Sequence, residues 1–144
     1  MLKTLQIPLL LIFLLVLGCK EQENTKDSDV RMQQVMEIHD EAMPRMGELS
    51  KLVGEMKSRI DSTERGQEYA EAMEELQEAH QEMMDWMQNF GDRFEPDEII
   101  NGKELSEEKK EWLLEEEEKI KAVRENINSS IEMARELLET DTIQ

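Results

Sequence analysis

The sequence has few aromatic residues, few basic residues and a single cysteine. Aromatic residues make up 4% of the 144 positions, and Cys19 is the only cysteine, so no intrachain disulfide can form. Lys and Arg number 17 against 35 Asp and Glu, which gives a formal charge of −18. A chain this acidic is repelled by nucleic acids and by anionic lipid head groups. We therefore expect no nucleic-acid partner and no basic membrane-binding face.

The signatures of common catalytic and metal sites are missing as well. The sequence has no His-Glu-x-x-His, no EF-hand loop, no phosphate-binding Gly-rich loop and no Gly-x-Ser-x-Gly. The Glu-x-x-His signature of di-iron helical bundles is also missing, because Met36 and Gln77 stand three positions before His39 and His80. We therefore predict that the protein is not an enzyme.

The N-terminus has the pattern of a lipoprotein signal. Lys3 precedes the run Ile7–Leu17, which contains only apolar residues and one proline. This run is too short to span a bilayer, which takes about 20 apolar residues, but it suits the apolar region of a signal peptide. It ends in Val-Leu-Gly-Cys at positions 16–19, which resembles the bacterial lipobox. The alternative is a plain signal anchor with a chance cysteine.

We predict that residues 1–18 form a cleaved signal peptide and that Cys19 carries the lipid, diacylglycerol and palmitate. Cleavage removes Lys3 and lowers the formal charge from −18 to −19. Residues 19–28 are predicted to form the lipid anchor and a flexible acidic tether, because they are polar and lack large apolar side chains. The stretch Cys-Lys-Glu-Gln-Glu at its start resembles the signal that sends Bacteroidota lipoproteins to the cell surface. We expect an outer-membrane lipoprotein of the cell envelope, periplasmic or surface-exposed.

Residues 29–144 are predicted to form an all-α domain, an antiparallel three-helix bundle resembling a coiled coil. Good helix formers dominate, and no alternating strand pattern is present. We expect helices over about 29–60, 67–90 and 106–139, with a bend at Pro44 and an N-cap at Ser106. Glu115 to Glu118 are expected to form a solvated face.

Each predicted helix carries an apolar stripe with spacings of mostly three and four residues. The stripes are Met32, Met36, His39, Met43, Met46, Val53 and Ile60 in the first helix, Tyr69, Met73, Leu76, His80, Met83, Met87 and Phe90 in the second, and Trp112, Leu113, Ile120, Val123, Ile127, Ile131, Ala134 and Leu138 in the third.

The first two stripes share the pattern His-x-Glu-x-Met-x-x-Met, at residues 39–46 and 80–87. A turn centred on Thr63 would place residues whose numbers sum to 126 opposite each other. The result would be a band of two histidines and four methionines between the helices, composed of His39, Met43, Met46, His80, Met83 and Met87.

The band has more than one chemical interpretation. Thioether and imidazole groups suit a soft metal such as Cu(I), and a haem held by His and Met is a related alternative. Methionine also fills irregular cores well, and a seam histidine can be satisfied by a carboxylate from the third helix. We favour packing over metal binding and predict no cofactor, with copper as the open alternative.

The lipobox, the two His-x-Glu-x-Met-x-x-Met segments and the long acidic last helix resemble a group of small helical lipoproteins of Bacteroidota. Members of this group are often labelled "viral A-type inclusion protein". The resemblance implies the compartment and the helical fold, but no activity. We expect a lipid-anchored envelope protein that binds or scaffolds a protein partner. The alternative function is soft-metal binding through the His/Met band.

Overall fold

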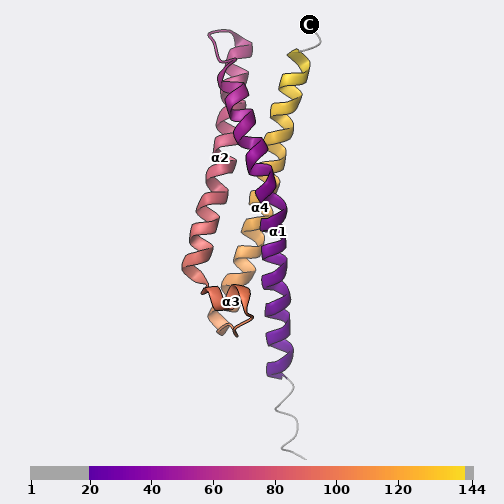
Figure 1. Ribbon diagram of the computed structural model, residues 1–144, viewed down its shortest axis with the longest axis vertical. Helices are drawn as coiled ribbons and strands as arrows, with labels where there is room; N and C mark the ends of the chain where they lie inside the picture. Colours follow the sequence, from indigo (N-terminus) through magenta and orange to yellow (C-terminus); the bar gives the residue numbers. More distant parts are fainter. Residues whose placement is uncertain (1–19, 142–144) are drawn as a thin grey trace, which may run out of the picture.

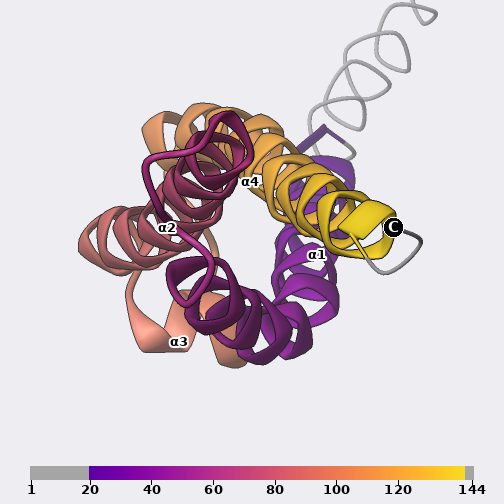
Figure 2. The ribbon, with the colours of Figure 1, turned by 90° about the horizontal axis from the view of Figure 1, so that it is seen from above.

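The computed structural model describes residues 20–141, and the predicted signal peptide and Cys19 lie outside this range. The described chain forms four helices and no strand: α1 (Lys20–Lys57), α2 (Glu64–Arg93), α3 (Pro96–Ile100) and α4 (Glu107–Asp141). The three long helices surround a common axis, and each runs antiparallel to the long helix before it in the chain (Figures 1 and 2). This arrangement confirms the predicted all-α bundle. Along residues 20–141 no helix combines the length and apolar character that a membrane crossing needs.

Helix α1 begins earlier than the sequence predicts. It starts at Lys20 rather than near Asp29, so the predicted tether continues directly into the bundle as helix. The tether residues include Glu, Lys and Gln, which are good helix formers even where no apolar stripe is present. The apolar pattern therefore marks the packed part of α1 but not its full length. The helix continues through Pro44 and ends at Lys57.

The turn between α1 and α2 caps the second helix. Thr63 is the N-cap, and its hydroxyl accepts a hydrogen bond of 3.0 Å from the backbone N–H of Gly66. The Asp61 carboxylate accepts hydrogen bonds from the hydroxyl and the backbone N–H of Thr63, and these hold the pKa of Asp61 below its ordinary value. This cap starts α2 at Glu64, three residues before the predicted start.

The connection between α2 and α4 contains the short helix α3, which the sequence analysis did not predict. Glu95 and Glu98 form a capping box at its start, and Lys109 donates a 2.6 Å hydrogen bond to Glu98. Gly102, which follows Asn101 after α3, has a φ of 66°, in the left-handed region that glycine tolerates. The predicted N-cap of the last helix is confirmed, because the Ser106 hydroxyl accepts a hydrogen bond from the backbone of Lys109.

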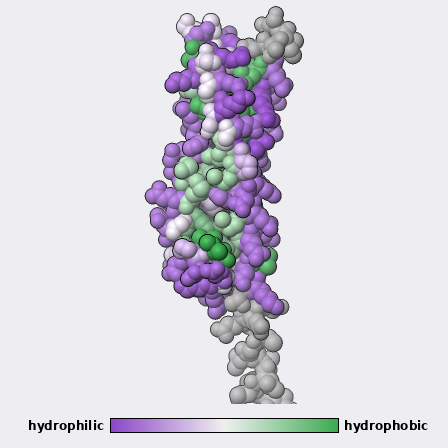
Figure 3. Space-filling model, in the orientation of Figure 1, coloured by the Kyte–Doolittle hydropathy of each residue, from purple (hydrophilic) through white to green (hydrophobic). Residues whose placement is uncertain are grey.

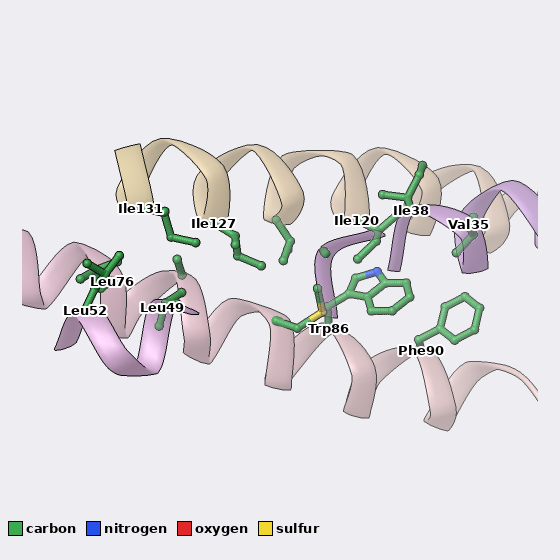
Figure 4. Close-up of a cluster of buried hydrophobic side chains, with 14 of the residues drawn as sticks. Val35, Ile38, Leu49, Leu52, Leu76, Trp86, Phe90, Ile120, Ile127 and Ile131 are labelled. Atoms are coloured by element: carbon green, nitrogen blue, oxygen red, sulfur yellow. The ribbon is translucent and has the colours of Figure 1, made fainter. Parts of the chain in front are cut away.

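The core lies between the three long helices, and the side chains labelled in Figure 4 point toward one another from α1, α2 and α4. The stripe predicted for α4 is largely confirmed, since Leu113, Ile120, Val123, Ile127, Ile131 and Ala134 are all buried. In α1 the predicted face is wrong by about one residue, or about 100° of rotation. The buried α1 side chains are Met32, Val35, Ile38, Ala42, Leu49, Leu52 and Met56.

Candidate functional site

His39 lies at the edge of the α1–α2 interface rather than in a buried seam. Its side chain is 17% exposed, and its ring stacks on Trp86 of α2 with a centroid separation of 5.8 Å and an interplanar angle of 30°. The Nδ1 atom lies 2.9 Å from the carboxylate of Asp40, the next residue in α1. The imidazole is therefore held by a ring contact on one side and by a carboxylate on the other.

His80 occupies a separate place on the same side of the bundle. It lines a groove of about 350 Å³ between α1 and α2, together with Leu49, Ser50, Val53, Gln77 and Gln81. The pairing of α1 with α2 is close to the predicted register, in which the numbers of facing residues sum to 126. The numbers of Leu49 and Gln77, which line the same groove, sum to 126, and those of the stacked pair His39 and Trp86 sum to 125. Trp86 follows His80 by six residues, so the two histidines lie at levels about 9 Å apart along the helices.

The four methionines of the predicted band do not share one environment. Met83 is fully buried and Met43 is 37% exposed, so the predicted Met43–Met83 layer is wrong. Met46 and Met87 are partly buried and pack against the core. Within residues 20–141, no group of three or more His, Cys, Asp or Glu side chains is arranged to hold a metal ion. That finding does not concern thioethers, so the soft-metal site stays a prediction.

A strip of neutral side chains covers the side of the bundle where α1 meets α2. We call it the neutral strip, and it consists of Met36, His39, Met43, Met46, Gly47, Ser50, Val53 and Gly54 from α1 and Met73, Gln77, His80, Gln81, Met84, Met87 and Gln88 from α2. Residues that line the groove place both halves on the same side, and the other members stand three, four or seven residues from them. The charged residues Lys57 and Glu74 stand at the same spacings and mark the end of the strip nearest the α1–α2 turn. No member carries a charge when its histidines are neutral.

The neutral strip is open to solvent along its outer edges. Met43 is 37% exposed and Met84 is 45% exposed, while Gly47 and Gly54 have nothing within 4 Å of where a Cβ would stand. A pale green band of weakly hydrophobic residues crosses the face formed by α1 and α2 (Figure 3). Acidic residues begin at its margins, where Asp40 lies against His39 and Asp85 accepts a 2.7 Å hydrogen bond from Gln81.

The two flanks of α4 are charged, in contrast to the neutral strip. Arg124 of α4 pairs with Glu41 of α1 at 3.0 Å, and Arg31 of α1 pairs with Glu117 of α4. On the other flank, Arg93 of α2 donates a 2.8 Å hydrogen bond to Glu115 of α4. Charged and hydrogen-bonded pairs therefore hold α4 to both neighbours, whereas α1 and α2 meet through rings, thioethers and amides on the strip side.

The acidic run at the start of α4 is partly buried, so the predicted solvated face is wrong. Glu116 is fully buried, and its Oε1 atom receives Arg93 at 3.0 Å and Lys119 at 2.9 Å. Glu117 is 9% exposed, and hydrogen bonds from Lys121 and then Arg31 lower its pKa despite desolvation. A carboxylate can occupy such a position because cations from neighbouring turns and helices compensate its charge.

A second groove, of about 320 Å³, lies between α2 and α4. Glu116 and Trp86 line it from opposite helices, along with Glu82, Asp85, Asn89, Lys119, Ala122, Val123 and Asn126. The indole nitrogen of Trp86 lies on the ring edge that faces α4 (Figure 4). This nitrogen and the Oε2 atom of Glu116 are buried and have no hydrogen-bond partner within the described residues. Both residues line the groove, and each keeps one polar atom that no described residue satisfies.

Sequence reasoning missed both the neutral strip and the buried carboxylates. The strip has a signal in α2, where Glu71, Glu75, Glu78 and Glu82 lie away from the helical positions of Gln77, Met84 and Gln88, while Glu74 and Asp85 lie at the edge beside Gln81. Mapping charge, rather than hydrophobicity, around this helix finds the strip. The burial of Glu116 has a weaker signal, which is its position three residues after Leu113 and four before Ile120.

Comparison with known proteins adds no relative, since no family model, no curated protein and no solved structure matches this chain.

Proposed function

We propose that this is a non-enzymatic, lipid-anchored protein of the cell envelope that binds a helical protein partner through the neutral strip. The observation that carries the proposal is the absence of charge from the strip, in a chain whose formal charge is −18. Elsewhere on α2 most of the exposed positions are occupied by Glu and Asp. A solvated helix face of this chain is therefore acidic, and the strip departs from that pattern along two adjacent helices.

The chemistry of the strip suits contact with another helix. Methionine side chains are flexible and polarizable, so they adapt to an irregular apolar partner. Gly47 and Gly54 lie two helical turns apart, with open space above both, and small residues let helix backbones approach closely. The glutamines supply donors and acceptors at the rim, where interfaces are polar.

The membrane anchor rests on the lipobox-like sequence and on the position of α1. Because α1 begins at Lys20, a lipid on Cys19 would hold the N-terminal end of the bundle at the membrane surface. The acidic bundle is repelled by anionic head groups, so the acyl chains would be the only attachment. We place the protein at the outer membrane, facing the periplasm or the outside.

The anchor is tested by Cys19→Ala in the full-length chain. We expect the variant to lack the lipid mass and to leave the membrane fraction, while the wild type stays there. Equal membrane retention and equal N-terminal mass in the two proteins would contradict the lipid anchor.

The binding role is tested by placing a photo-crosslinking amino acid at Met84 of the full-length protein in cells. Gln33, an exposed residue of α1 outside the strip, is the matched control position. We expect discrete protein adducts from position 84 and few from position 33. A second substitution, Gly47→Glu, should abolish the adducts, because it places a charge in the contact. Adducts that form equally at both positions, or that survive Gly47→Glu, would overturn the proposal.

A further inference from the structure

We infer that Met43 and Met84 are sites of reversible oxidation by a small peroxide, and that their oxidation weakens binding at the neutral strip. Methionine is oxidised to a sulfoxide, which dedicated reductases convert back to methionine. The oxidation itself is a property of the chain alone. Its effect on binding rests on the proposed function of the strip and adds a means of regulating that surface.

Exposure distinguishes these two methionines from the others of the strip. Met43 is 37% exposed and Met84 is 45% exposed, whereas Met83, the neighbour of Met84 in the sequence, is fully buried. The other methionines of the strip are partly buried and pack against the core, and they are Met36, Met46, Met73 and Met87. A peroxide must reach the sulfur to react with it, so on this side of the bundle Met43 and Met84 react first.

The two exposed methionines lie at nearly the same level on neighbouring helices. Their numbers sum to 127, against 125 for the stacked pair His39 and Trp86. A difference of two residues corresponds to about 3 Å along the helices. Gly47, one turn after Met43 in α1, has nothing within 4 Å of where a Cβ would stand. Both side chains are therefore accessible in the middle of the surface that we propose meets the partner.

The chain offers a peroxide few competing sulfur atoms. Cys19 is the only cysteine, and under the proposed anchor its sulfur carries the lipid. Within the described part of the chain the one other exposed methionine is Met133, at 48% exposure. Met133 belongs to α4 and not to the neutral strip. Its oxidation should leave the partner contact unchanged, which makes it a matched control.

The reaction transfers one oxygen atom from the peroxide to the thioether. A lone pair of the methionine sulfur attacks a peroxide oxygen, so that an S–O bond forms while the O–O bond breaks. The proton on the transferred oxygen passes to the leaving hydroxide, which departs as water. The sulfur loses two electrons and the peroxide gains them. An apolar side chain thus becomes a polar sulfoxide, and burying it against an apolar partner costs free energy.

The modification is tested on the purified full-length protein with hydrogen peroxide as the probe. Samples taken at increasing times are digested, and mass spectrometry measures the gain of one oxygen at each methionine. We expect Met43 and Met84 to react at least tenfold faster than the fully buried Met83. Equal rates at these three positions would overturn the inference.

The effect on binding is tested in cells with the photo-crosslinking amino acid at Gln77, which lines the groove of the strip, so that both oxidation sites remain. We expect hydrogen peroxide, added shortly before illumination, to lower the yield of adducts at least fivefold. The double variant Met43→Leu, Met84→Leu should form adducts that peroxide no longer affects, because leucine is apolar, similar in volume to methionine and free of sulfur. The control Met133→Leu should stay as sensitive as the parent.

The possible failures separate the inference from the proposed function. If peroxide oxidises both methionines without changing the adduct yield, or if the double leucine variant stays sensitive, the regulation is overturned and the binding role stands. If no strip-dependent adducts form even without peroxide, the binding role and its regulation are both overturned. The oxidation rates decide in either case whether Met43 and Met84 are the reactive sites.

Discussion

Gly66 and Gly47 provide a matched pair of substitutions that tests the turn before α2. Both are helical glycines, but a Cβ at Gly66 would lie 2.6 Å from the backbone nitrogen and 2.7 Å from the backbone oxygen of Asp61, whereas a Cβ at Gly47 meets nothing within 4 Å. We therefore expect Gly66→Ala to destabilise the protein and Gly47→Ala to stabilise it.

The magnitudes follow from the two environments. An alanine in place of an open helical glycine gains roughly 0.5–1 kcal/mol of unfolding free energy, because the unfolded glycine has more backbone freedom. At Gly66 the contacts are with backbone, so Asp61 and the chain around it must move. Overpacking of this kind typically costs about 1–3 kcal/mol. The movement would also disturb the Thr63 cap on Gly66, and such a cap is typically worth about 1 kcal/mol.

Urea denaturation followed by far-UV circular dichroism measures both effects on the chain with Cys19→Ser, provided that the slope with urea is unchanged. We expect the midpoint of Gly66→Ala to fall and that of Gly47→Ala to rise relative to the parent. A Gly66→Ala protein as stable as its parent would show that the Asp61 turn does not lie over the start of α2.

Three further predictions follow from the described contacts. Met83→Ala should lower the unfolding free energy by about 2–5 kcal/mol because Met83 is fully buried. The adjacent and 45% exposed Met84 should tolerate alanine within about 0.5 kcal/mol; equal effects in urea would refute this assignment of the α2 face that enters the core. Glu117→Gln should destabilise the protein at pH 7. The difference should begin to shrink below the ordinary carboxyl pKa of 4.5 and vanish once the pH has fallen through the lower pKa of Glu117 in the folded protein; a pH-independent difference would refute this. We expect no Cu(I) binding at micromolar concentration, because His39 and His80 lie at levels about 9 Å apart along the helices. A Cu(I) complex that forms with the wild type and is lost when both histidines are replaced by leucine would establish the metal site instead.

The sequence predicts the helical class and most of α4, but not the orientation of α1. On one side of α4 the branched aliphatics Leu113, Ile120, Val123, Ile127 and Ile131 recur at spacings of three, four or seven, which marks a single face for burial. In α1, methionines, leucines and alanine are distributed around more than half of the helix, and the stripe Met36–His39–Met43–Met46 competes with Val35–Ile38–Ala42–Leu49. The sequence alone cannot rank these stripes, because the choice depends on which partner helices cover them.

The candidate site was harder to predict for the same reason. The His-x-Glu-x-Met-x-x-Met repeat is real, and both histidines do lie near the α1–α2 interface. Its interpretation as a buried band required both stripes to face inward, and a rotation of α1 by about one residue moves Met43 to the surface. The same rotation creates the neutral strip, so the surface we propose for binding consists largely of residues expected in the core.

The charged flanks of α4 have a consequence for how the chain folds. The specific polar contacts that fix the helices relative to one another come mainly from α4, through residues such as Arg124 and Glu117, and at its far end Leu137 accepts a 3.1 Å hydrogen bond from Arg65. Helix α4 (Glu107–Asp141) is the last of the described helices in chain order. A nascent chain that has completed only α1 and α2 lacks these contacts and the part of the core that α4 supplies. The bundle can therefore close only after α4 has been synthesised, so the α1–α2 hairpin must wait for the third helix before its core is covered.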